Sequence, residues 1–78
     1  MPTLLRAGPY RFFIYAADCR EPAHVHVERD DNVAKFWLRP VRIENNDGFR
    51  RNEINRIYRV IEDNLSDLLR GWDEQCSD

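Results

Sequence analysis

The first half of the chain alternates hydrophobic and polar residues with the two-residue period of β-strands. In the segment HVHVER, the two valines fall on one face, while His24, His26 and Glu28 fall on the other. Residues 29–32 (RDDN) have the composition of a turn, and residues 33–38 (VAKFWL) return to extended structure. We therefore predict a β-hairpin whose valine face meets the core.

Further strands are indicated on both sides of this hairpin. Residues 9–18 (PYRFFIYAAD) carry aromatic residues on both faces, which is typical of a strand that is covered on both sides. Residues 40–44 (PVRIE) favour a short strand with Pro40 at its start, because proline fits only an edge or the beginning of a strand. Residues 45–48 (NNDG) then interrupt the pattern.

The second half of the chain changes to the three-and-four spacing of a helix. We predict one long helix over about residues 51–74, with two helices as the alternative. Asn64 followed by Asp67 resembles a second helix start and marks the place where the helix would bend or break. The hydrophobic stripe consists of Ile54, Ile57, Tyr58, Ile61, Leu65, Leu68, Leu69 and Trp72.

These patterns together predict an α+β fold in a single domain over residues 1–78. We expect a three- or four-stranded antiparallel sheet covered on one face by the C-terminal helix. The packing positions would be Ile54, Ile57, Ile61, Leu65 and Leu68. A chain of 78 residues buries only about 60% of the surface that its unfolded form exposes, so we also expect a partner protein or a homodimer.

Charge is distributed unevenly along the chain. The net charge is −2, but residues 1–59 carry 11 basic against 8 acidic residues, and residues 60–78 carry 1 against 6. An acidic tail repels nucleic acid and favours a basic surface. Arginine suits phosphate and carboxylate groups, and four arginines are candidate contacts to nucleic acid, including RNA. They are Arg29, Arg39, Arg51 and Arg59.

The sequence gives no indication of a membrane or secreted protein. It lacks a run of some 18 apolar residues, and its start, MPTLLRAGPYRFF, lacks the features of a signal peptide, so we expect a cytoplasmic location and no membrane contact. Cys19 and Cys76 are far apart and form no CxxC motif. Because cytosolic thiols stay reduced, we do not expect a disulfide.

The histidine pair is the strongest candidate for chemistry. Alternate strand positions place His24 and His26 roughly 7 Å apart at the backbone, close enough for two imidazoles to flank one phosphate. Histidine serves as acid and as base near neutral pH, as RNA cleavage requires. Glu28 would orient an imidazole, and Lys35, with Arg29 or Arg39, would stabilise the transition-state charge. This pattern predicts an RNase-type site.

Two other interpretations of the histidines stay open. They are also consistent with ordinary strand residues on a wetted sheet face that meets a partner protein. His24, His26 and Glu28 could supply three metal ligands from one face, but Cys19 and Asp18 would have to fold back and HxH lacks the fuller spacing of a zinc motif, so we expect no metal and no cofactor. The aromatic residues likewise allow base stacking, although core positions are the default in so small a chain.

A set of segments then identifies a resemblance that covers nearly the whole chain. The segments are MPTLLR, YRFFIY, EPAHVHVER, AKFWL, PVRI, the Gly48–Phe49 pair, and the closing LL with Trp72. Together they resemble the small bacterial family known as domain of unknown function 4160. Arg50 stands where the family more often has serine, so the capping box with Glu53 is lost.

The resemblance implies a context and leaves the chemistry open. Members of that family are typically encoded beside a protein of domain of unknown function 2442, and the two have been proposed as a toxin–antitoxin pair. We therefore expect a component of a toxin–antitoxin-like pair with a cognate partner from an adjacent gene, and RNase-type activity through the histidines. The alternative is a non-catalytic module that binds a partner or nucleic acid.

Overall fold

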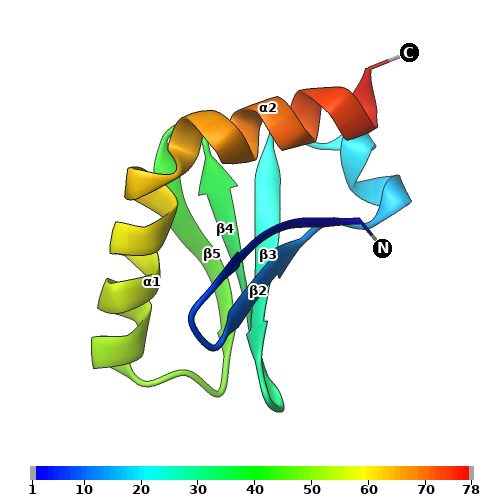
Figure 1. The fold of residues 1–78 in the computed structure, drawn as a ribbon. Coiled ribbons are helices and arrows are strands. Elements are labelled where there is room, and N and C mark those ends of the chain that lie inside the picture. The colour runs from blue at the N-terminus through cyan, green and yellow to red at the C-terminus, as the bar shows by residue number, and fades with distance from the viewer. Residues whose placement is uncertain (1, 78) are drawn as a thin grey trace.

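The computed structural model describes residues 2–77 and contains an antiparallel sheet followed by two helices (Figure 1). The five strands lie side by side in chain order, and a short 3₁₀ helix, η1 (Ala16–Arg20), separates the second strand from the third. The strands are β1 (Thr3–Ala7), β2 (Tyr10–Phe13), β3 (His24–Arg29), β4 (Asn32–Leu38) and β5 (Val41–Asp47). The helices are α1 (Arg51–Asp63) and α2 (Leu65–Cys76). The α+β class is confirmed.

The sheet has one more strand, and one longer strand, than the sequence predicted. The prediction of three or four strands is wrong because β1 adds a fifth, which pairs antiparallel with β2. The fourth predicted strand is also longer than expected, since β5 continues through Asn45, Asn46 and Asp47. These polar residues pair with Lys35, Ala34 and Val33 of β4 at the edge of the sheet. Backbone pairing at an edge therefore outweighs their low strand propensity.

The central hairpin matches the predicted alternation. β3 and β4 pair from His24 opposite Trp37 to Arg29 opposite Asn32, and Asp30 turns the chain with a φ of 55°. Val25 and Val27 are fully buried. The predicted valine face of the hairpin is therefore the face that enters the core.

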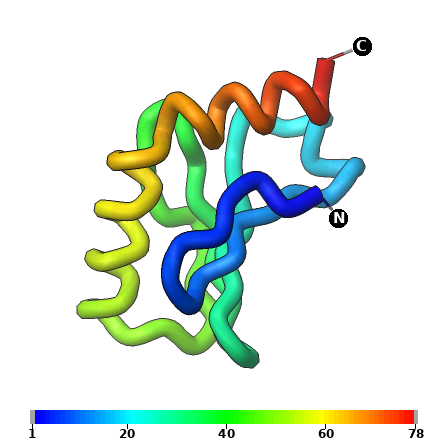
Figure 2. The backbone as a smooth tube through the Cα atoms, in the orientation of Figure 1, coloured from blue at the N-terminus to red at the C-terminus, as the bar shows by residue number. Residues whose placement is uncertain are grey.

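The predicted single long helix is instead two helices. Asn64 has φ −118° and ψ 19°, outside helical values, and its side-chain amide donates a 2.8 Å hydrogen bond to the carbonyl of Val60. Figure 2 shows the chain turning between the two helices, so that α2 crosses one end of the sheet while α1 runs beside β5. The break falls where the alternative prediction placed it, and Asn64 is both the C-cap residue of α1 and the N-cap residue of α2, although its side chain makes no capping hydrogen bond to α2.

One hydrophobic cluster joins both helices to the strands. Ile57, Ile61 and Leu68 are fully buried and Ile54 is nearly so, whereas Leu65 is only partly buried. The hydrophobic residues of α2 keep the spacing of the predicted stripe beyond the break, and α2 contacts β1 and η1. None of the helices formed by residues 2–77 is both long enough and apolar enough to cross a membrane.

A disulfide joins Cys19 of η1 to Cys76 at the end of α2, so the prediction of unpaired thiols is wrong. The two residues are 57 positions apart in sequence, but their Cα atoms lie 5.3 Å apart. Sequence spacing does not reveal such a contact, because it arises only when α2 turns across the sheet and meets η1. The bond fixes η1 against the end of the C-terminal helix.

Candidate functional site

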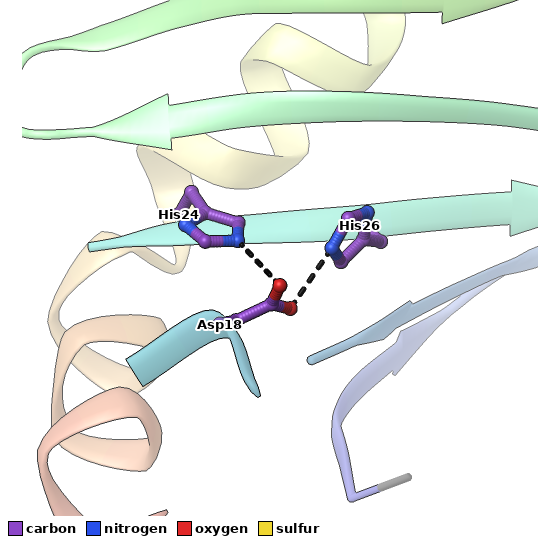
Figure 3. A group of neighbouring side chains, drawn as sticks. All are labelled: Asp18, His24 and His26. Carbon is purple, nitrogen blue, oxygen red and sulfur yellow. Dashed lines mark hydrogen bonds and ion pairs between the residues drawn. The ribbon is translucent and has the colours of Figure 1, made fainter. Parts of the chain in front are cut away.

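The carboxylate of Asp18 lies between the two histidines (Figure 3). Its Oδ2 is 2.9 Å from Nε2 of His26, and its Oδ1 is 3.2 Å from Nε2 of His24. Both histidines come from the polar face of β3, and Asp18 comes from η1. The site therefore joins two segments that the sequence pattern did not link.

The local fold of η1 holds the carboxylate in place. The backbone N–H of Tyr15, just before η1, donates a 2.8 Å hydrogen bond to Oδ2 of Asp18, and the N–H of Asp18 donates back to the carbonyl of Tyr15. The neighbouring residue, Cys19, is tied to α2 by the disulfide. Asp18 is thus fixed both by its own turn and by a covalent link one residue away.

His24 is fully buried and cannot reach solvent. Its ring lies between Trp37 of β4 and Trp72 of α2, with ring centroids 5.5 Å and 5.1 Å away. Its Nδ1 lies 2.9 Å from the carbonyl oxygen of Pro22. Because a carbonyl oxygen only accepts hydrogen bonds, Nδ1 carries a proton and donates it, which leaves Nε2 directed toward Asp18.

His26 is the more accessible of the two, with 16% of its side chain exposed. It packs against Phe13 and Tyr15, whose ring centroids lie 5.5 Å and 5.0 Å from its own. Burial lowers the pKa of His26 below its ordinary value, although Asp18 opposes this effect. The neutral imidazole is therefore favoured near pH 7.

The Asp18 carboxylate stays ionised in this setting. Burial alone would raise its pKa, but the hydrogen bond from the Tyr15 backbone and the two nearby histidines together lower it below its usual value. An ionised carboxylate occupies the space between the rings, where the two-histidine mechanism would place a phosphate. The arrangement suits orientation of an imidazole or capture of a cation better than binding of an anion.

Two of the predicted supporting residues are engaged elsewhere. Glu28 forms an ion pair with Arg11 on β2 and does not join the histidines. Arg29 lies on the opposite face of β3, where it pairs with Glu53 of α1. The structure thus places Asp18, rather than Glu28, as the acidic residue of the cluster.

Lys35 lies opposite His26 in the ladder between β3 and β4. Its ammonium group is 2.8 Å from the carboxylate of Glu21 and 4.7 Å from the centre of the Trp37 ring. Arg51 and Arg59 are exposed on α1, apart from the histidine cluster. Of the predicted basic residues, Lys35 alone directly adjoins His26 across the sheet.

Arg39 belongs to a separate pocket on the rim of the sheet. This pocket has a volume of about 330 Å³. Arg39 is 58% exposed, and its only ion-pair contact within residues 2–77 is a 3.9 Å approach to Asp73. The Trp37 pocket, as we call it, is lined by Pro22, Trp37, Arg39, Pro40, Arg42 and Glu44.

The sequence indicated Asp18 only as a residue that would have to fold back for a metal site, and that arrangement was disfavoured because residues 9–18 were predicted to form one strand. In the structure β2 ends at Phe13, and the chain turns into η1 so that Asp18 faces back toward β3. The segment AADCREP contains no glycine-rich turn motif, so the sequence did not indicate that the chain reverses direction there. The feature of the sequence that could have identified this site residue is an acidic residue six positions before the first histidine.

The fold and the cluster define a small α+β protein with an aspartate–histidine–histidine centre. The chain belongs to the family described as Domain of unknown function (DUF4160), whose model matches residues 10–73. The matched range includes Asp18, both histidines and the Trp37 pocket. No curated protein and no solved structure matches the chain.

Proposed function

We propose that this chain is the partner-binding component of a bacterial toxin–antitoxin-like pair. Its cognate partner, encoded by an adjacent gene, would place an acidic anchor side chain in the Trp37 pocket. The observation that carries the proposal is the pocket itself, which combines a tryptophan wall with two exposed arginines. The two-gene context is part of the proposal and is carried over from the family resemblance described in the sequence analysis.

The composition of the Trp37 pocket supports a protein partner. Tryptophan and arginine are the residues most enriched among those that dominate binding energy at protein interfaces. Within residues 2–77 Arg42 has no ion pair, and Arg39 has only its long contact with Asp73. The lining also holds one carboxylate, Glu44, which accepts a hydrogen bond from Trp37, so the two arginines leave an excess of positive charge. This excess favours a carboxylate on the partner, since arginine binds carboxylates through paired hydrogen bonds.

The charges of the whole chain favour a protein over RNA. Nucleic-acid-binding domains are usually strongly basic, whereas this chain has a net charge of −2 and a pI of about 5.6. The ionised Asp18 between the histidines also disfavours a phosphate at that position. We therefore propose a binding role, and the RNase-type activity becomes an outcome that the experiment can reveal.

The test is the affinity of the purified chain for the purified product of the adjacent gene, measured by isothermal titration calorimetry. We expect Arg42→Glu to weaken binding at least about tenfold, because it sets a like charge against the acidic anchor. Arg51→Glu makes the same charge change on the exposed face of α1 and should bind as the wild type does. Equal affinities for the two variants and the wild type would contradict the proposal.

The same purified chain is incubated with single-stranded RNA. We expect the RNA to remain intact. Cleavage that falls about 10²-fold or more in a folded His26→Ala variant would instead restore the catalytic interpretation.

A further inference from the structure

We infer that Asp18, His24 and His26 form a binding site for one zinc ion. None of these three residues lines the Trp37 pocket, although His24 contacts Trp37 and Pro22 of its lining, and the inference does not depend on the proposed partner. It rests on three observations: the convergence of three donor atoms, a buried nitrogen that lacks a hydrogen bond, and a shell of contacts that fixes the donors.

The donor atoms are close enough to share one ion. One nitrogen from each histidine and one carboxylate oxygen of Asp18 all lie within 4.8 Å of one another. Zinc binds nitrogen and oxygen at about 2.0–2.2 Å, so two ligands of the same ion lie roughly 3–4 Å apart. The contacts of 3.2 Å and 2.9 Å between the carboxylate and the two rings already fall near this range. Small side-chain rotations would close the site around an ion.

The second observation is the state of Nε2 of His24. This atom is fully buried and has no hydrogen-bond partner, even though Oδ1 of Asp18 lies 3.2 Å away. With Nδ1 directed to the carbonyl of Pro22, Nε2 faces a carboxylate oxygen without a hydrogen bond. A buried polar atom without a partner costs free energy, and this atom faces a carboxylate oxygen 3.2 Å away. A cation between them satisfies both.

The surrounding contacts resemble those that hold metal ligands in place. Histidine ligands usually donate their second ring N–H to a carbonyl or carboxylate, and Nδ1 of His24 makes such a contact with Pro22. The carboxylate of Asp18 is fixed by the Tyr15 backbone. The partial exposure of His26 leaves a side for the ion to enter and for water to complete the coordination.

The donor set points to zinc rather than to calcium or magnesium. Two imidazoles and one carboxylate are common zinc ligands, whereas calcium and magnesium prefer oxygen atoms alone. Three protein ligands leave one position of a tetrahedral ion for water. Because the ion would join η1 to β3, binding would also stabilise the contact between these two segments.

Zinc binding to the chelator-treated full chain is measured by isothermal titration calorimetry. Thiols are omitted, so that Cys19 and Cys76 remain joined and cannot bind the metal. We expect one zinc per chain and an increase in the thermal unfolding midpoint. Cobalt(II) titrated into the same protein should give the visible absorption of a tetrahedral ion.

The variants Asp18→Asn and His26→Gln test the ligands without emptying the fully buried His24 position. We expect each to weaken zinc binding by more than the roughly 10- to 100-fold that loss of an outer-shell partner costs. Glu28→Gln lies on the same strand face outside the cluster and should bind as the wild type does. Circular dichroism confirms that each variant is folded before titration. Binding that is absent in the wild type, or unchanged in both ligand variants, would overturn the inference.

Discussion

Glu53 of α1 accepts two hydrogen bonds from the guanidinium group of Arg29 on β3, each at 2.7 Å. The hydroxyl of Tyr10 donates a third, at 3.2 Å. Two parallel charge-assisted bonds are among the strongest polar contacts in proteins. This pair fastens the first turn of α1, whose cap residue Arg50 makes no side-chain hydrogen bond, to the core-facing side of the sheet.

This ion pair predicts an acid-dependent loss of stability. The hydrogen bond from Arg29 is the main cause that holds the pKa of Glu53 below its usual value. The unfolded chain therefore takes up this proton more readily, and the stabilisation is full above the ordinary glutamate pKa of about 4.3 and is lost progressively as the pH falls below it. We expect Glu53→Gln to lower the free energy of unfolding at pH 7 and to flatten its decline in that range. Urea unfolding at a series of pH values measures both effects.

The matched control for this prediction is Glu62→Gln, which changes an exposed carboxylate on the same helix. It should leave the pH profile close to that of the wild type. If the Glu53 and Glu62 variants gave the same profile, the contact with Arg29 would not be the source of the acid dependence.

The disulfide predicts a large effect of reduction on stability. Cys19 and Cys76 close a loop with a sequence separation of 57, and a crosslink of this kind restricts the unfolded chain. We expect the double variant Cys19→Ser/Cys76→Ser to lose about 2–4 kcal/mol of unfolding free energy. Urea unfolding of the wild type with and without a reductant provides the comparison. A wild type that is equally stable in both conditions would contradict the expectation.

The hydroxyl of Tyr58 on α1 predicts a smaller and more local effect. It accepts a 2.7 Å hydrogen bond from the backbone N–H of Ile43, which lies in the edge strand β5. We expect Tyr58→Phe to cost about 1 kcal/mol and to speed amide hydrogen exchange at Ile43. Tyr15→Phe removes a hydroxyl from a side chain that is 43% exposed and should leave that amide unchanged.

The sequence predicted the parts of the fold whose hydrophobic patterns involve residues close together in the chain. The alternation in HVHVER identified the buried valines, and the RDDN turn identified the hairpin between β3 and β4. The helical stripe identified Ile57 and Ile61 as core residues. Each of these patterns repeats within a few residues, so no tertiary contact is needed to recognise it.

The parts that the sequence did not predict depend on contacts across the fold. β1 is stabilised by pairing with β2 and by packing of Leu4 against Gly71 of α2. The stripe could not distinguish one helix from two, because the hydrophobic phase is kept across Asn64. Asp18 joined the histidines only because η1 reverses the chain. The sequence therefore indicated the two histidines of the candidate site, but it did not show that a turn brings Asp18 to them.

The order of strands in the sheet, which is also their order in the chain, has a consequence for how the protein folds. Three of the four strand pairs are connected by two-residue links, at residues 8–9, 30–31 and 39–40. Closing such short loops costs little entropy, and a topology rich in local contacts is associated with fast folding. The β2–β3 link is the longer one, and it holds η1. We therefore expect the three-stranded unit β3–β4–β5 to form early. The docking of α2 against η1 would be the late step that completes the aspartate–histidine cluster.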